Sequence, residues 1–189
     1  MCPTCTITTN ALNSAASAFM LAIRNPILTK WVIVITTIGG PINVSMFCLV
    51  LVMVFWLHGK MRTIVQFLGS LAACGVVTLI FKALVALPRP TGALVQETGY
   101  SFVSAHASIA TIFFLLIAYT YKSHIKNTFL RFCFVALNVL IILVIGLSRI
   151  YLGVHYASDV LGGFLVGVMI FAFSVMIFEV YNKKHPVSW

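Results

Sequence analysis

The chain has 189 residues, of which 61% are hydrophobic and only 8% are charged. Soluble domains carry about 25% charged residues, so this composition excludes an ordinary water-soluble protein and indicates that most of the surface faces lipid. The formal net charge is +9, but the basic residues lie between long apolar runs instead of along one polar face, which excludes a nucleic-acid partner.

Residues 1–30 form an N-terminal segment in front of the first long apolar run. Between positions 11 and 23, apolar residues recur at helical spacing and polar residues take the other side. This pattern predicts a short amphipathic helix that lies in the membrane interface, with a shortened first membrane span as the alternative. The apolar positions are Leu12, Ala15, Ala16, Phe19, Met20 and Ile23, and the polar ones are Asn13, Ser14 and Ser17.

The five cysteines separate into two groups. Cys2 and Cys5 form a Cys-x-x-Cys pair, but no second pair accompanies it, so a redox or metal role has little support. Cys48, Cys74 and Cys133 lie inside apolar runs, where we expect small core or lipid-facing residues.

Residues 31–189 form the predicted membrane bundle, because five segments in this range reach the roughly 20 apolar residues that a membrane-spanning helix needs. The first segment contains Gly39, Gly40 and Pro41, which predict a kink or a break. We therefore expect an all-α fold, a polytopic membrane helical bundle with about five transmembrane helices plus the N-terminal interfacial helix. The five segments are Trp31–Leu57, Thr63–Ala86, Phe102–Tyr121, Thr128–Leu147 and Ser158–Tyr181.

Basic residues cluster after the first, third and fifth predicted spans, which is one side of the membrane if the spans alternate. The positive-inside rule makes that side cytoplasmic. The other side then holds the N-terminus and the stretches 87–101 and 148–157. The basic clusters are His58, Lys60 and Arg62, then Lys122, Lys126 and Arg131, then Lys183 and Lys184.

The predicted extracytoplasmic side carries three clusters of polar residues next to the apolar runs. A charge at bilayer depth costs about 2.5–3.5 kcal/mol on insertion scales, so these residues are expected to face the bundle interior and to have partners. Three cations that converge on one mouth would form an anion site, and the arginine fork matches phosphate oxygens. The clusters are Lys82 with Arg89, Ser104 with His106, and Arg149 with His155 and Asp159.

Two histidines in these clusters have features of catalytic groups. His106 lies near the N-terminus of the third span, where unpaired backbone N–H groups and the helix dipole favour a bound phosphate. His155 and Asp159 are four residues apart, so on a helix the carboxylate can fix the imidazole tautomer. One histidine would then be the nucleophile and the other the general acid. Taken singly, each residue could also be an interface residue or a structural contact between helices.

The three clusters together resemble the signature of the type 2 phosphatidic acid phosphatase superfamily. That signature is Lys-x6-Arg-Pro, then Pro-Ser-Gly-His, then Ser-Arg-x5-His-x3-Asp. The first motif matches fully as KALVALPRP, from Lys82 to Pro90, and the third as SRIYLGVHYASD, from Ser148 to Asp159. The second reads VSAH, with Val103 in place of proline and Ala105 in place of glycine.

The resemblance implies a role for each matching position. His155 would attack phosphorus and form a phosphohistidine, Asp159 would orient it, and His106 would protonate the leaving oxygen. It implies neither a metal nor a cofactor. Membrane members of the family usually have six spans, whereas five are clear here. The residues that would bind phosphate are Lys82, Arg89, Ser104 and Arg149.

We therefore expect an integral membrane lipid phosphatase, multi-pass in the cell (inner or plasma) membrane, with its active site on the extracytoplasmic face. Its partners would be the bilayer and a lipid phosphate. Family analogy favours undecaprenyl diphosphate, with phosphatidylglycerophosphate or phosphatidic acid next. A lipid phosphotransferase and a non-catalytic anion or lipid transporter remain the alternatives. Glu97 and Tyr151 are expected to be solvent or interface residues.

Overall fold

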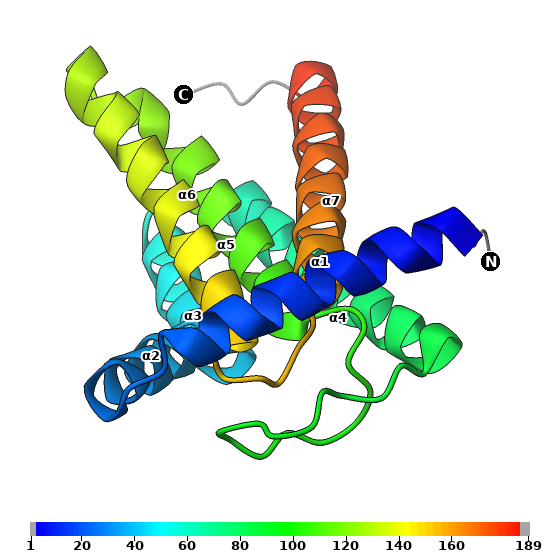
Figure 1. Cartoon of the computed structure of the whole chain (residues 1–189). Coiled ribbons are helices and arrows are strands. Elements are labelled where there is room, and N and C mark those ends of the chain that lie inside the picture. Colours follow the sequence, from blue (N-terminus) through cyan, green and yellow to red (C-terminus); the bar gives the residue numbers. More distant parts are fainter. Residues whose placement is uncertain (1–2, 186–189) are drawn as a thin grey trace.

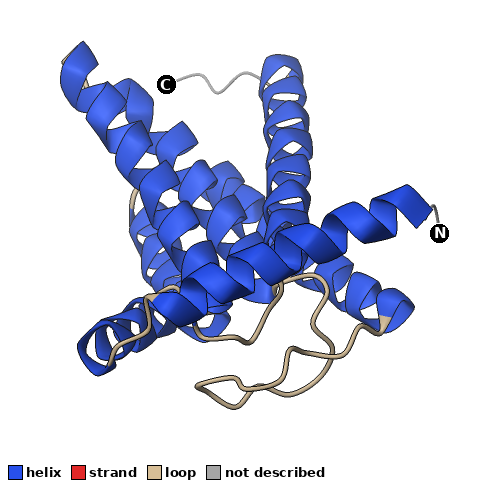
Figure 2. Ribbon diagram, in the orientation of Figure 1, coloured by secondary structure: helices blue, strands red, loops and turns tan. Residues whose placement is uncertain are grey.

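The computed structural model describes residues 3–185 of the chain. Every regular element in this range is a helix, so the predicted all-α class is confirmed (Figures 1 and 2). Cys2 and the side chain of Cys5 lie outside the described part of the chain. The elements are α1 (Pro3–Ala22), α2 (Pro26–Ile38), α3 (Pro41–Leu57), α4 (Met61–Val85), α5 (Ala105–Tyr121), the short 3₁₀ helix η1 (Lys122–His124), α6 (Thr128–Tyr151) and α7 (Ala157–Lys184).

Four of the described helical stretches are long and apolar enough to cross a membrane, namely α4, α5 with η1, α6 and α7. The pair α2 and α3 passes the same test when taken together, with a bend of 46° between them. The predicted break is therefore confirmed, and its cause is local: Gly40 is the N-cap of α3 and Pro41 is its first residue. Proline is suited to a first helical turn but cannot continue a preceding helix.

Large apolar side chains remain exposed around the bundle. Leu84 is 77% exposed, Phe132 is 69% exposed and Leu165 is 65% exposed, and each belongs to one of the four candidate spans. A water-soluble protein rarely leaves so continuous an apolar surface uncovered. These helices therefore have the surface of membrane spans, with lipid as their solvent.

Helix α5 lies in the middle of the bundle and packs against α3, α4, α6 and α7. Two glycines let α7 approach it closely. A Cβ atom at Gly163 would lie 2.7 Å from the backbone oxygen of Ser104, and one at Gly167 would lie 2.8 Å from that of Ser108. Small residues spaced four apart are a common device for close helix contact in membranes. The contact holds the start of α5 beside the start of α7.

Helix α1 crosses the bundle instead of running along it (Figure 1, dark blue). It packs against α6 and α7 and is not among the candidate spans within residues 3–185. Asn13, on the predicted polar side, bonds to the first turn of α7: its side chain donates to the Ser158 hydroxyl (3.1 Å) and accepts from the Ser158 N–H (3.0 Å). Leu12 and Phe19 on the predicted apolar side stay exposed.

Several predicted boundaries differ from the observed ones, and two of these differences affect the polar clusters. The third span was expected from Phe102, but helix α5 begins at Ala105, because Ser104 caps it. The fourth span was expected to end at Leu147, but α6 continues to Tyr151. The extra turn places Arg149 on the helix itself, where it is almost completely buried.

Candidate active site

Lys82 lies in the last turn of α4, just before Ala86 ends the helix in a left-handed conformation (φ 47°). Its ammonium group donates a hydrogen bond to the carbonyl oxygen of Tyr100 and lies 3.5 Å from that of Ser101. Lys82 therefore ties the end of α4 to the chain that leads into α5. The longest loop of the molecule joins these two helices (Figure 2).

Arg89 lies in that loop, and its guanidinium is at the centre of a bonded cluster. The Nη1 donor is 3.3 Å from Nε2 of His155, and Nη2 lies 3.8 Å from the carboxylate of Glu97. Arg89 thus connects the loop after α4 with the loop between α6 and α7. Three further acceptors, each 3.0 Å away, are the carbonyl oxygens of Thr98, Gly99 and Val154.

His155 follows α6 and is 4% exposed. Gly153 makes the turn before it with a φ of 71°, which a side chain at that position would disfavour. With Nε2 facing the Arg89 donor, the neutral ring carries its proton on Nδ1. Burial lowers the pKa of His155, the hydrogen bond that its ring donates to Asp159 opposes this, and the nearby charge of Arg89 lowers the pKa again. The imidazole is therefore held in its neutral, nucleophilic form.

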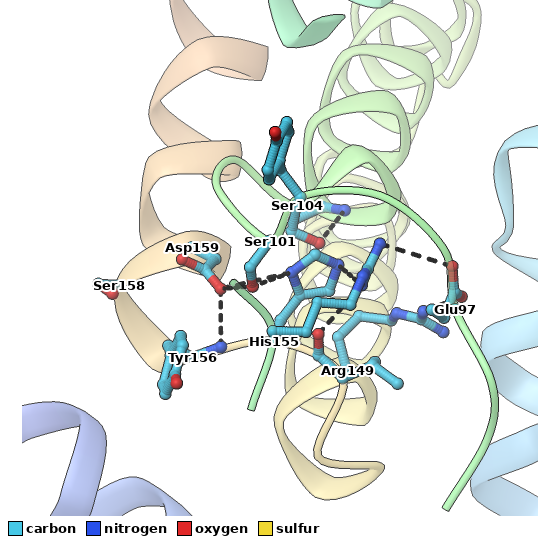
Figure 3. Close-up of polar contacts among 12 residues, drawn as sticks. Glu97, Ser101, Ser104, Arg149, His155, Tyr156, Ser158 and Asp159 are labelled. Atoms are coloured by element: carbon cyan, nitrogen blue, oxygen red, sulfur yellow. Dashed lines mark hydrogen bonds and ion pairs between the residues drawn. The ribbon is translucent and has the colours of Figure 1, made fainter. Parts of the chain in front are cut away.

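Asp159 lies in the first turn of α7 and is fully buried. One carboxylate oxygen, Oδ2, lies 3.4 Å from Nδ1 of His155, accepts a bond from the backbone N–H of Tyr156 (2.8 Å), and accepts another from the hydroxyl of Ser101. The Ser101 hydroxyl is also 3.3 Å from Nδ1 of His155, so it lies between the two groups (Figure 3). The expected pairing of His155 and Asp159 is therefore present, with Ser101 as a third member.

Ser104 is completely buried and is the N-cap of α5. Its hydroxyl oxygen accepts a hydrogen bond from the N–H of Ala107 (3.4 Å), and its own N–H donates to the backbone oxygen of Asp159 (3.1 Å). The Ser104 side chain therefore caps the helix that carries His106. As the N-cap, it satisfies one of the N–H groups of the first turn that have no partner within the helix.

His106 lines a cavity of about 440 Å³ that opens beside the break between α2 and α3. Arg149, Glu97 and Thr36 line the same cavity. A Cβ atom at Gly40 would lie 3.2 Å from Nε2 of His106, so the glycine keeps the backbone of the break close to the imidazole. The cavity thus contains one of the two histidines together with a buried cation.

Arg149 is 1% exposed, and its guanidinium donates to the hydroxyl of Thr36 (2.9 Å) and to the carboxylate of Glu97. Partial burial acts to raise the pKa of Glu97, but the charge of Arg149 and its hydrogen bond outweigh this and lower the pKa below the usual value. Glu97 is therefore ionised, and its carboxylate lies between Arg149 and Arg89.

The seven predicted site residues fall into two sets that meet at Glu97. His106 and Arg149 line the cavity, and Glu97 lines it with them. The second set lies outside that lining and is joined to it through the contact of Arg89 with Glu97. This second set consists of Lys82, Arg89, Ser104, His155 and Asp159.

One expectation from the sequence is wrong, and another is incomplete. Glu97 is exposed, as expected for a solvent or interface residue, but its carboxylate also pairs with two arginines of the site. The signal for this pairing was the scarcity of acidic residues, since Glu97 is one of only three in the chain. Tyr151 was expected at the surface as well, but it is 3% exposed and its hydroxyl lies 2.9 Å from that of Thr29, so it is a structural residue. The motifs do not predict Ser101, which precedes the second motif and contacts both His155 and Asp159.

Known proteins share both the sequence pattern and the fold of this chain. The sequence profile of the PAP2 superfamily matches residues 63–183. Phosphatidylglycerophosphatase B of Bacillus subtilis (strain 168) is 32% identical over 175 residues, which cover 87% of this chain and 84% of that protein. The crystal structure of a transmembrane PAP2-type phosphatidylglycerolphosphate phosphatase from Bacillus subtilis is similar with a TM-score of 0.81 at 27% identity, over 96% of this chain and 91% of the other.

A second solved structure shares the fold alone. It is LpxE from Aquifex aeolicus, with a TM-score of 0.70 at 22% identity, over 87% of this chain and 95% of the other. The profile match includes all three motif segments, from Lys82 to Asp159, and it extends over more than half of the chain. With its apolar helices, the protein is a multi-pass membrane protein, and it belongs to the PAP2 superfamily.

Proposed function

We propose that this protein hydrolyses a phosphate monoester or diphosphate of a membrane lipid through a phosphohistidine on His155. One observation carries the proposal. The His155 ring lies between Asp159 with Ser101 on its Nδ1 side and Arg89 on its Nε2 side. This arrangement supports a neutral imidazole whose unprotonated nitrogen faces a cation that can hold phosphate oxygens.

In the first proposed step, the lone pair on Nε2 of His155 attacks phosphorus and the bond from phosphorus to the lipid oxygen breaks. His106 donates a proton to that leaving oxygen. The phosphorylated ring keeps its proton on Nδ1 and becomes cationic, and the buried carboxylate of Asp159 stabilises it at 3.4 Å. In the second step, water attacks phosphorus, His106 takes a proton from the water, and the nitrogen–phosphorus bond breaks to release phosphate.

The cations of the site would balance the charge on the transferred phosphoryl group. Arg149 and Arg89 both contact Glu97, so the position between them already suits an anion. A phosphate that binds both guanidinium groups has to displace the Glu97 carboxylate. Lys82 would contribute a point charge from the end of α4, where it now bonds to backbone oxygens.

The names of the Bacillus subtilis relatives make phosphatidylglycerophosphate the first substrate to test. Undecaprenyl diphosphate, which the family pattern favoured, and phosphatidic acid are the next candidates. All three present a phosphate on an apolar tail, which suits a polar site at the end of a helix bundle. The lipid tails would remain in the bilayer while the headgroup enters the cavity beside the break between α2 and α3.

The site is proposed to face the extracytoplasmic side of the cell membrane. Lys60 begins α4, and Lys183 with Lys184 ends α7, both at the end of the bundle away from His155. Basic residues of this kind remain in the cytoplasm in most membrane proteins. A cysteine-accessibility experiment in intact cells tests this orientation: a single cysteine in place of Thr91, in the exposed loop after α4, should react with a membrane-impermeant maleimide.

The central experiment measures phosphate release by purified protein in detergent from a panel of the three lipids. We expect release from at least one of them, loss of release in His155→Ala, and full release in His58→Ala, whose histidine is exposed at the opposite end. Unchanged release in His155→Ala removes the mechanism. ³²P in a second lipid instead of in free phosphate identifies a phosphotransferase. A protein that binds these lipids without releasing phosphate from any of them is a binding or transport protein.

A further inference from the structure

We propose that a groove between α4 and α7, at the end of the bundle away from the candidate active site, binds one anionic phospholipid. The groove has a volume of about 490 Å³ and a mostly apolar lining. We call it the α4–α7 groove. It contains none of the residues assigned to phosphate transfer, and the proposal does not depend on that activity. The lining residues used below are Arg62, Gln66, Gly69, Phe173, Ile177 and Tyr181.

Gln66 is the first reason to expect a ligand. Its side chain lines the α4–α7 groove and is buried, with 8% exposure. Within residues 3–185, neither Nε2 nor Oε1 of Gln66 has a hydrogen-bond partner. A buried amide without partners costs about 1–3 kcal/mol, and such groups in native proteins are nearly always satisfied. Both amide atoms are buried as the side chain now lies, so a polar group in the groove, such as the ester or glycerol part of a lipid, would supply the missing partners when the side chain turns toward the groove.

The charge at the open end of the groove identifies the headgroup. Arg62 lies there, bonded through Nη1 to the side chain of Asn182 (3.0 Å) and stacked 5.1 Å above the ring of Tyr181. Lys60 precedes Arg62 on α4, and the C-terminal turn of α7 carries two lysines. The acidic residue of this part of α7, Glu179, accepts a bond from Tyr119 on α5 and does not line the groove. The end of the groove is therefore cationic and suits a phosphate.

The spacing of these groups along α4 matches a phospholipid. Gln66 follows the first residue of the helix, Met61, by five residues, which is about 7.5 Å at the α-helical rise. Interfacial helices bury their apolar face about 5–10 Å into the boundary between headgroups and acyl chains, so this distance is on the scale of that boundary. Arg62 would thus contact the phosphate and Gln66 the ester region of the same lipid.

The apolar part of the groove has room for an acyl chain. Gly69 lies one helical turn beyond Gln66, and a Cβ atom there would have no neighbour within 4 Å. Phe173 and Ile177 of α7 form the facing wall. A chain that continues from the ester region would fill this space. The combination of an apolar slot, an unpaired amide and a cationic end fits a phospholipid better than an apolar helix of a second copy, which would leave Gln66 unsatisfied.

The test compares two lipids and three proteins by native mass spectrometry and thermal unfolding in detergent. Phosphatidylglycerol and phosphatidylcholine with identical chains differ only in the headgroup, which is anionic in the first and zwitterionic, with no net charge, in the second. Gly69→Phe fills the groove, and Gly75→Phe is its matched control, because a Cβ at Gly75 also has no neighbour within 4 Å and Gly75 does not line the groove. We expect wild type and Gly75→Phe to bind one phosphatidylglycerol about tenfold more tightly than phosphatidylcholine, and Gly69→Phe to lose this binding.

Arg62→Gln supplies a second test that leaves the apolar part of the groove, around Gly69, unchanged. It should remove the preference for phosphatidylglycerol while leaving the weaker binding of phosphatidylcholine unchanged. Equal binding of both lipids by wild type overturns the proposal. Phosphatidylglycerol binding that survives in Gly69→Phe overturns it as well, since the lipid would then bind elsewhere, including at the active site. A dimer that dissociates in Gly69→Phe without any bound lipid overturns it in favour of a second copy.

Discussion

The carboxylate of Glu97 accepts a hydrogen bond from the buried guanidinium of Arg149, and its second oxygen lies 3.8 Å from Arg89. The two arginines reach this carboxylate from different parts of the chain, Arg149 from α6 and Arg89 from the loop after α4. One internal anion therefore lies between two cations that belong to the motif segments. Under the proposed function, binding of a substrate phosphate would be an exchange of one anion for another.

Glu97→Gln should tighten the binding of inorganic phosphate by about 3–10-fold. The amide keeps the shape of the side chain but removes the charge that competes for Arg149, and apparent affinity rises when a larger fraction of the protein is free to bind. The inhibition constant for phosphate measures this effect. Weaker phosphate inhibition in Glu97→Gln would mean that Glu97 holds the arginines in place instead of competing for them.

His106→Ala should lower turnover of a lipid phosphate by about 10²–10⁴-fold, because it removes the proposed proton donor to the leaving oxygen. The loss should be much smaller with p-nitrophenyl phosphate, whose leaving group needs no proton. The ratio of the two rates in the variant, against the same ratio in wild type, is the measurement. An equal loss on both substrates would assign His106 to phosphate binding instead of proton donation.

In a plot of kcat/KM against pH, the acid limb should have its midpoint below the ordinary histidine pKa of about 6.5. Attack requires the neutral His155 ring, which exists above its pKa, and burial lowers that pKa in the folded protein. As the pH falls, activity therefore persists to lower values than an unperturbed histidine would allow.

Asp159→Asn is the control for the origin of this limb. The hydrogen bond and charge of Asp159 raise the pKa of His155, so their removal should shift the limb further toward acid in the residual activity. If the acid limb of Asp159→Asn lies at the same pH as that of wild type, it reports the ionisation of the substrate phosphate. A wild-type acid limb above about pH 7 contradicts a lowered pKa for His155.

EDTA should leave phosphate release intact. The two acidic residues of the site already have other partners, since Glu97 pairs with arginines and Asp159 bonds to Ser101 and to the N–H of Tyr156. Magnesium and calcium sites normally need several oxygen ligands together. Phosphate release before and after dialysis against the chelator is the measurement, and abolition followed by recovery with a divalent ion would refute metal-independent catalysis.

Gly163→Ala should destabilise the protein by about 1–3 kcal/mol, because the new methyl group must be accommodated between two packed helices. Its Cβ would lie 2.7 Å from the backbone oxygen of Ser104 and 2.8 Å from Ala107. Gly75→Ala, whose Cβ meets nothing within 4 Å, should be neutral or slightly stabilising. Thermal unfolding in detergent compares the two, and equal midpoints would show that α5 and α7 can separate without loss.

Local sequence sufficed wherever the deciding interaction is local. Long apolar runs predict spans because the bilayer sets their length, and Pro41 predicts the break between α2 and α3 because proline lacks an N–H. The pairing of His155 and Asp159 was predicted from their separation of four residues on a helix, and the pair is present, but His155 lies before α7, so it forms across the start of that helix and not along one helix face.

Contacts between distant parts of the chain depended on the tertiary structure. Glu97 and Arg149 are 52 residues apart, and Asn13 and Ser158 are 145 apart, so no periodicity or motif spacing relates them. Side-chain partners of this kind are decided by how helices pack, and the packing of α7 on α5 depends on the absence of a Cβ atom at Gly163. The residue types predicted a phosphate site from the charges it needs, and the folded bundle decided that the carboxylate of Glu97 lies between two of those charges, Arg89 and Arg149.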